Sequence, residues 1–200
     1  MNARQRSQAE TRRRLLEQGL KLFASQGVAE TRTADIAEGA GVAVGTLYLH
    51  FKDKQGLLRA VLFEGVEQLM AELHKLAEEP LPDIGEYVLR HTELMVRFAQ
   101  THRDMCRVLF DPEAVRCRIS TEITDMFVLF QERRLCGQAE AGLLAPGIGP
   151  KVAAHAVVGL LTHTLEWWIR HPEEVDAGTV ISTLVNLRLS GLYAAGGGAA

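Results

Sequence analysis

The 200-residue sequence has few features of secreted or membrane proteins. Its three cysteines, Cys106, Cys117 and Cys136, have no CxxC spacing, so we expect free thiols in a reducing cytoplasm. The N-terminus is polar and basic and lacks the apolar segment of a signal peptide. The one long apolar stretch, Val152–Ile169, contains two histidines and Glu166, which are costly in lipid. It therefore predicts a buried helix rather than a membrane span.

Catalytic and metal-binding motifs are also missing. No HExxH, P-loop or GxSxG sequence occurs, and no histidine follows a glutamate by three positions as in a di-iron bundle. We therefore expect no enzyme, no metal centre and no cofactor. A redox or metal sensor remains an alternative, because folding could bring the three cysteines together, although buried free cysteines are usually inert.

Charge is unevenly distributed along the chain. Residues 1–56 carry nine Lys/Arg and six Asp/Glu, whereas the remainder carries 13 and 19. A basic head on an acidic body suits a polyanionic partner for the head alone, although such polarity also arises by chance.

Hydrophobic periodicity is helical almost throughout, and no window alternates as a strand does. We predict an all-α protein of about nine helices. Three N-terminal helices over residues 1–56, with an N-terminal arm over about 1–8, would form a small domain that precedes a larger helical-bundle domain over 57–195. The last helices are predicted at Glu113–Gly142, Lys151–His171 and Ala177–Tyr193.

The segment Asp35–Phe51 has the spacing of a helix-turn-helix. Ala37 is small enough for two helices to cross closely, and Gly41 permits the positive φ of the turn. The second helix would bury Leu47 and expose small residues that fit a major groove. By spacing alone, an ordinary helical hairpin is an equal alternative.

Residues Arg12–Leu62 closely resemble the DNA-binding domain of TetR-family repressors. The matching pieces are Leu22-Phe23-Ala24, Gly27, Thr31, Asp35-Ile36-Ala37, Ala40-Gly41-Val42, Gly45-Thr46-Leu47-Tyr48, His50-Phe51, Lys54, Leu57-Leu58 and Val61-Leu62. The rest of the chain resembles the family only in its helix layout. The resemblance implies that the helix beginning at Val44 reads DNA sequence and that Thr33, Thr46, Tyr48, His50 and Lys54 contact DNA.

The chain departs from the family pattern in two places. Ala43 and Val44 stand where polar or basic residues are common, so we expect apolar contacts with thymine methyl groups. Arg32 stands where a Ser or Thr usually caps the helix, which costs about 1 kcal/mol unless Thr31 or Thr33 substitutes. Arg32 could instead contact a phosphate. The predicted DNA-binding residues are Arg32, Thr33, Ala43, Val44, Gly45, Thr46, Tyr48, His50 and Lys54.

The N-terminal arm has two interpretations. Its arginines, Arg4, Arg6 and Arg12–Arg14, could follow phosphates or enter a minor groove. They could equally form a solvated, partly disordered head.

The last two helices are predicted to form a homodimer interface. They carry small and apolar stripes that could pack on a partner or on the protomer's own core, and the family resemblance implies a four-helix interface. The predicted interface residues are Ala156, Gly159, Leu160, His163, Leu184 and Leu187.

Polar residues that interrupt apolar faces in the middle helices indicate a small-molecule pocket, although each could simply be a satisfied core residue. The predicted lining is His91, Met95, Phe98, Cys106, Phe110, Phe127, Phe130, His155, Glu166 and Trp167. The sequence thus predicts a cytoplasmic homodimeric regulator without a membrane partner. The family resemblance implies that a small-molecule effector, unknown and expected to be largely apolar, would release it from palindromic operator DNA. Activation instead of repression stays open.

Overall fold

The computed structural model describes residues 2–80 and 83–193. Within these ranges the chain is all-α, as predicted, with ten helices. The helices are α1 Ala3–Gln26, α2 Thr33–Gly39, α3 Val44–His50, α4 Lys54–Glu78, α5 Ile84–Thr101, α6 Arg103–Leu109, α7 Pro112–Arg116, α8 Ile119–Glu140, α9 Pro150–Arg170 and α10 Ala177–Leu192. None of the helices in the described part of the chain has both the length and the apolar character needed to cross a membrane.

The helix predicted over Glu113–Gly142 is in fact two helices, which explains the tenth. Arg118 adopts a positive φ of 61° between α7 and α8. This left-handed conformation cannot continue a right-handed helix. No glycine or proline marks the break, so the sequence pattern did not reveal it.

The chain divides into two compact units. The first holds the described residues up to Glu67 together with His102–Thr121, and the second holds Gln68–Thr101 and the described residues from Glu122 onward. The predicted boundary at residue 56 falls near the start of α4, whereas α4 continues into both units. The first unit extends further because α6 packs against α1. Residues 194 and 195, at the end of the predicted second domain, lie outside the described residues.

The core of the first unit fixes the helix-turn-helix. Ala37 and Leu47 are fully buried, and Gly41 has a positive φ of 67° in the turn between α2 and α3. A residue with a Cβ would strain this turn by roughly 1–2 kcal/mol. The physical requirements identified in the sequence for Ala37, Gly41 and Leu47 are all met.

Helix α1 begins earlier than its apolar periodicity indicates. Asn2 and Gln5 form a capping box, with hydrogen bonds of 2.9 Å in both directions, and residues 3–8 are helical. This reciprocal cap satisfies backbone donors that a helix start leaves free. The described residues of the predicted arm therefore continue α1.

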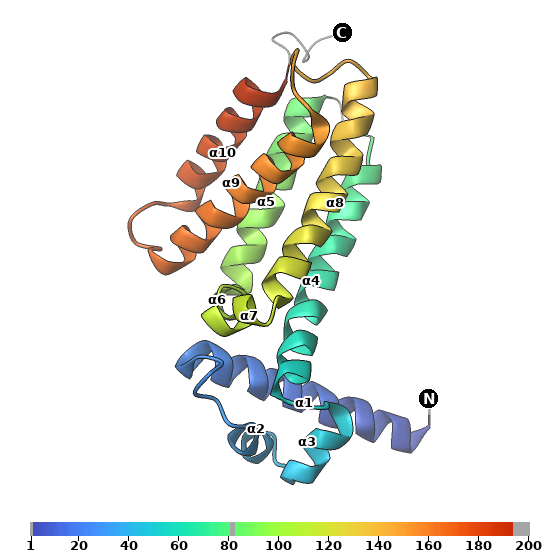
Figure 1. Ribbon diagram of the computed structural model, residues 1–200, viewed down its shortest axis with the longest axis vertical. Coiled ribbons are helices and arrows are strands. Elements are labelled where there is room, and N and C mark those ends of the chain that lie inside the picture. Colours follow the sequence, from blue (N-terminus) through green and yellow to red (C-terminus); the bar gives the residue numbers. More distant parts are fainter. Residues whose placement is uncertain (1, 81–82, 194–200) are drawn as a thin grey trace. The chain divides into compact units, whose positions relative to one another are not determined.

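The second unit is a bundle in which α5, α8, α9 and α10 lie as long neighbouring helices (Figure 1). Helix α5 packs against both α9 and α10. Val128 and Leu135 of α8 share a buried cluster with Ala153, Ala154 and Val158 of α9. These small residues let α9 approach α8 closely. The pocket described below lies among α5, α8 and α9.

Candidate DNA-binding site and ligand pocket

Helix α3 exposes an apolar face. Val44, Tyr48 and Leu49 are 40%, 50% and 84% exposed, whereas Leu47 is fully buried. Gly45 lies on the same exposed side, and a Cβ built there would meet no atom within 4 Å. The fold itself therefore does not require glycine at this position. A slim, partly apolar helix face is suited to a major groove.

Hydroxyl groups at the start of α2 and on α3 are held together. The Thr33 and Tyr48 hydroxyl oxygens lie 3.1 Å apart. Since Tyr48 is half exposed, this pair presents donors beside the α3 face, in keeping with the predicted phosphate contacts.

The start of α2 lacks a side-chain cap, as its sequence suggested. Thr31 donates instead to the Gly27 carbonyl at 2.7 Å, and Thr33 is paired with Tyr48, so neither threonine replaces the missing cap. Arg32 binds both carboxylate oxygens of Asp35, at 2.9 and 2.6 Å, and keeps the pKa of Asp35 below its ordinary value. A phosphate contact by Arg32 would have to compete with this ion pair.

Lys54 has a structural contact that the sequence did not predict. Its ammonium group donates to the carbonyl oxygens of Val28, Ala29 and Thr31 at 2.8, 2.9 and 3.0 Å. An ammonium has three donors, so all of them are used. Lys54 thus holds the loop between α1 and α2 against the start of α4, and the predicted DNA contact would have to compete with these hydrogen bonds.

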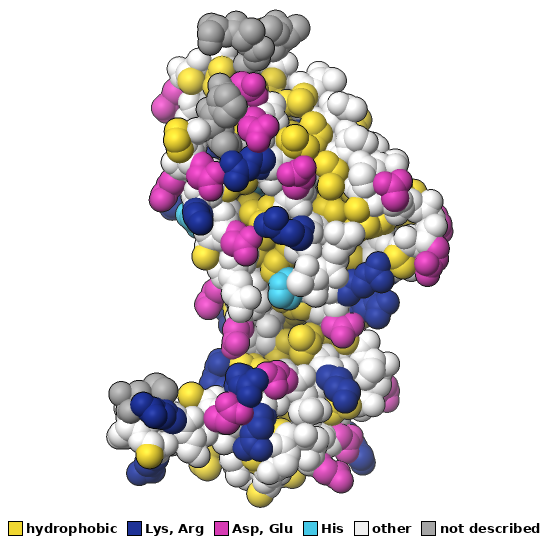
Figure 2. Space-filling model, turned by 180° about the vertical axis from the view of Figure 1, so that it is seen from behind, with side chains coloured by type: hydrophobic (Ala, Val, Ile, Leu, Met, Phe, Trp, Pro, Cys, Tyr) yellow, Lys and Arg dark blue, Asp and Glu magenta, His cyan; other side chains and the backbone are white. Residues whose placement is uncertain are grey.

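Several arginines of α1 are paired within the protein. Arg12 contacts Glu64 at 3.2 Å, and Arg13 bridges Glu10 and Glu17. On the face of the molecule in Figure 2, Lys and Arg side chains lie beside Asp and Glu side chains. These pairs leave fewer arginines of α1 free to contact phosphates.

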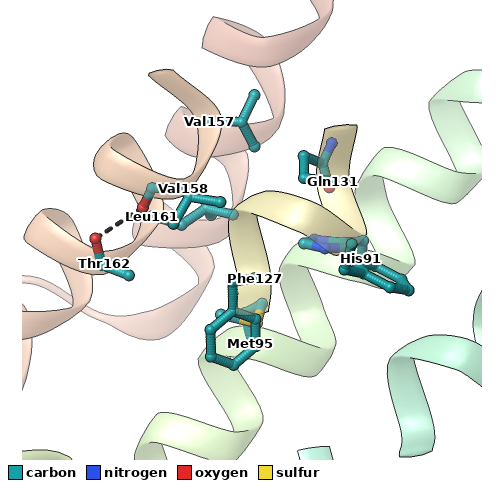
Figure 3. Close-up of a pocket in the computed structure, with 9 residues that line it drawn as sticks. His91, Met95, Phe127, Gln131, Val157, Val158, Leu161 and Thr162 are labelled. Carbon is teal, nitrogen blue, oxygen red and sulfur yellow. Dashed lines mark hydrogen bonds between the residues drawn. The ribbon is translucent and has the colours of Figure 1, made fainter. Parts of the chain in front are cut away.

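The second unit contains an apolar pocket bounded by α5, α8 and α9 (Figure 3). The pocket is small. The volume in which the centre of a water molecule fits is about 10 Å³, which is close to the minimum needed to hold a single water. The lining residues are His91, Met95, Phe127, Phe130, Gln131, Val157, Val158, Leu161 and Thr162.

Four of the ten predicted effector residues line this pocket, namely His91, Met95, Phe127 and Phe130. The sequence missed Gln131 and the α9 residues, although Gln131 lies one turn after Phe127 on α8 and could have been found by helical spacing.

The other six predicted residues lie outside this lining. Cys106 and Phe110 belong to the first unit, and Phe98 is half-buried on α5. His155 and Trp167 are on the exposed side of α9, and Glu166 pairs with Arg170 at 2.7 Å.

Most of the predicted dimer residues are accessible. Ala156, Gly159 and His163 are exposed on α9, Leu160 is half-buried, and Leu187 is 54% exposed on α10. Leu184 is different: it is 1% exposed and packs within its own protomer. Leu184 shares the buried side of α10 with Arg188, one turn later, whereas Leu187 lies about 60° around the helix from Leu184 and is exposed at the edge of the predicted stripe.

A polar cluster adjoins the pocket, in which Tyr87, His91 and Arg188 are buried and Arg134 is half-buried. Of these four residues only His91 was predicted. Arg188 of α10 is 1% exposed, and its Nη1 lies 2.9 Å from the Thr92 hydroxyl and 3.4 Å from His91 Nδ1. Arg134 of α8 covers the Tyr87 ring at 3.6 Å. The sequence signal was a single arginine within the apolar helix α10.

The electrostatics of this cluster are unusual. Burial, reinforced by the charges of Arg188 and Arg134, holds the pKa of His91 well below its ordinary value. Burial also raises the pKa of Tyr87 to about 12, although both arginines oppose that rise. His91 and Tyr87 are therefore neutral at physiological pH, and the positive charge belongs to the arginines.

The family model and the relatives that match this chain point to the same family of regulators. Residues 15–61 match the family model described as bacterial regulatory proteins, tetR family. The HTH-type transcriptional regulator AcrR of Shigella flexneri is 29% identical over 180 residues, which cover 84% of this chain and 82% of AcrR. TtgR of Pseudomonas putida is 27% identical and covers 84% of each chain.

Solved structures agree over nearly the whole length. NalD of Pseudomonas aeruginosa, the secondary repressor of the MexAB-OprM multidrug efflux pump, matches with a TM-score of 0.74 at 26% identity, over 94% of this chain and 98% of NalD. The transcriptional regulator FadR of Bacillus subtilis, solved with stearoyl-CoA, matches with a TM-score of 0.78 at 18% identity, over 90% and 98%. These relatives are regulators, in agreement with the prediction that the chain is not an enzyme. Residues 15–61 thus match the DNA-binding domain of the tetR family, and over nearly its whole length the chain is similar to TetR-family transcriptional regulators.

Proposed function

We propose that the protein is a cytoplasmic homodimeric repressor that a small-molecule effector releases from a palindromic operator. The observation that carries this proposal is the exposed face of α3, where Val44, Tyr48 and Leu49 are accessible around Gly45. Such a face has no structural use in the free protomer, whereas groove binding would bury it.

Sequence would be read at the N-terminal end of α3. Ala43, Val44 and the methyl group of Thr46 offer apolar contacts suited to thymine methyl groups. Gly45 keeps this end slim, although the protein itself has room for a larger residue there, since an added Cβ would meet no protein atom within 4 Å. Tyr48, Thr33 and His50 would supply contacts to phosphates. Lys54 would act indirectly, by holding the α1–α2 loop.

Dimerisation would use the accessible sides of α9 and α10. Val152 and Leu187 are 75% and 54% exposed, and the small residues Ala156 and Gly159 lie on the accessible side of α9. A second copy would bury this apolar surface, and a two-fold dimer would match the two half-sites of a palindrome. Residues 1–56 would then serve DNA binding, and residues 57–195 dimerisation and effector binding.

The effector would enter the pocket among α5, α8 and α9. Its largely apolar lining favours a largely apolar molecule, and the FadR relative was solved with stearoyl-CoA, a ligand with a long apolar chain. Because the pocket holds about one water, an effector must displace lining side chains. It would therefore favour a conformation other than this one, as a population shift requires.

A gel-shift titration tests the proposal. The full-length protein is mixed with the DNA upstream of its own coding sequence, with excess non-specific competitor and a salt series. We expect a specific shift that weakens steeply with salt and a palindromic footprint. Absence of any shift at low salt would refute the proposal. Transcription from that DNA, with and without the protein, separates repression from activation.

A further inference from the structure

Arg188 is an interior cation without a counter-ion. The ionisable side chains that influence it are Tyr193, Tyr87 and Arg134, and no carboxylate is among them in the described part of the chain. A buried guanidinium without a paired anion is strongly unfavourable. An unsatisfied buried polar group of this kind calls for a partner, and a bound ligand is one that would satisfy it.

The guanidinium edge of Arg188 that has no partner, formed by Nε and Nη2, is the edge with which arginines commonly bind a carboxylate. Its Nη1 contacts Thr92 and the Val88 carbonyl, whereas its Nε and Nη2 are buried and have no partner among the described residues. Elsewhere in this protein that same Nε/Nη2 edge holds a carboxylate. It does so in the pairs Arg13–Glu10, Arg32–Asp35 and Arg116–Glu113.

Two further donors beside Arg188 are unused. The Tyr87 hydroxyl and the Arg134 Nε are buried and have no hydrogen-bond partner in the described residues. Tyr87 and His91 are neighbours on α5, with ring centroids 5.7 Å apart. The cluster therefore combines positive charge with several free N–H and O–H donors and no fixed acceptor.

His91 joins this cluster to the apolar pocket. Its Nδ1 lies 3.4 Å from Arg188 Nη1, and the same side chain lines the pocket together with Met95 and Phe127 (Figure 3). A molecule lying along the apolar lining would thus have one end at the charged cluster. Met95 can change rotamer readily to admit it.

We propose that the effector carries a carboxylate, which Arg188 binds through Nε and Nη2 with help from Tyr87 and Arg134, while its apolar part occupies the pocket beyond His91. This inference rests on the proposed effector-released function and specifies the chemistry of the ligand. The carboxylate would neutralise the interior charge and satisfy the unpartnered donors.

Calorimetric titration of the full-length protein, without DNA, tests the inference. The probes are decanoate and decanol, phenylacetate and phenylethanol, and inorganic phosphate. We expect each carboxylate to bind roughly tenfold or more tightly than its alcohol, as hydrogen bonds to a charged group imply. Equal binding of acid and alcohol would overturn the inference, as would phosphate binding as tightly as decanoate.

Substitutions identify the residues responsible. Arg188→Met should abolish the preference for the carboxylate and should not lower the melting temperature of the ligand-free protein, because it removes an unpaired charge. Tyr87→Phe, which removes an unpartnered hydroxyl, should weaken decanoate binding without loss of stability. Tyr193→Phe is the matched control: its hydroxyl is bonded to Gln138 at 3.1 Å, so stability should fall while the preference remains. A preference retained in both Arg188→Met and Tyr87→Phe would contradict the assignment.

A parallel gel shift of the ligand-free protein separates the two proposals. Operator binding without a carboxylate preference overturns this inference and leaves the proposed function standing. Carboxylate binding by a protein that binds no DNA overturns the proposed function and leaves the ligand site standing.

Discussion

Replacing Lys54 with methionine tests a contact that changes the role predicted from the sequence. Methionine keeps an unbranched chain and removes the ammonium that donates to Val28, Ala29 and Thr31. A hydrogen bond from a charged donor contributes about 1.5–3 kcal/mol. Lys54 is only half-buried, and the three bonds share one charge, so we expect a loss of about 2–4 kcal/mol in the free energy of unfolding.

Two measurements distinguish this role from a phosphate contact. Urea unfolding at a single protein concentration reports the stability. The slope of the logarithm of the DNA-binding constant against the logarithm of salt concentration reports phosphate contacts, because each contact adds about 0.9 to the magnitude of the slope. Lys54→Met should lose stability and keep the wild-type slope. Lys52→Met, which alters an exposed lysine two positions earlier, is the stability control. A Lys54→Met protein as stable as wild type, with a slope reduced by about one, would refute the structural role.

Three further predictions address the turn, the α3 face and the cysteines. Gly41→Ala should destabilise the protein by roughly 1–2 kcal/mol, because φ is 67° there; an unchanged thermal melt would contradict this. Operators with uracil in place of thymine should bind more weakly, and Val44→Ser should alter sequence preference; equal binding in both tests would exclude methyl contacts. A thiol reagent at neutral pH should label exposed Cys136 and leave Cys106 unlabelled, since burial raises the Cys106 pKa to about 12; rapid labelling of Cys106 would refute its burial.

A fourth prediction concerns the oligomer. Leu187→Asp places a charge on the accessible side of α10 and should convert a dimer into monomers in light scattering, because a buried unpaired charge opposes association. A Leu187→Asp protein that remains dimeric would locate the interface elsewhere.

The helix-turn-helix could be predicted because its requirements are local. Each requirement involves residues only a few positions apart. Two helices cross closely at Ala37, the turn needs a positive φ at Gly41, and the second helix buries one face at Leu47. The same locality explains why four pocket residues on α5 and α8 were found, since apolar spacing along each helix indicates its buried side.

Contacts between distant residues could not be read in the same way. Lys54 binds carbonyl groups 23–26 positions away, and Arg188 meets Thr92 across 96 positions. Neither sequence pattern nor charge count reveals such partners. Leu184 and Leu187 illustrate a related difficulty, because both fit an apolar stripe and only tertiary packing decides which one is buried. The break at Arg118 is similar, because a strained backbone conformation leaves no trace in residue type.

Specific operator binding is the claim on which the account depends. The most direct measurement compares the dissociation constants for the footprinted operator and for a scrambled duplex of equal length and composition at physiological salt. The operator should bind about a thousandfold or more tightly than the scrambled duplex, and Tyr48→Ala should weaken binding to both duplexes. Equal affinity for the two duplexes, with Tyr48→Ala indistinguishable from wild type, would contradict this claim.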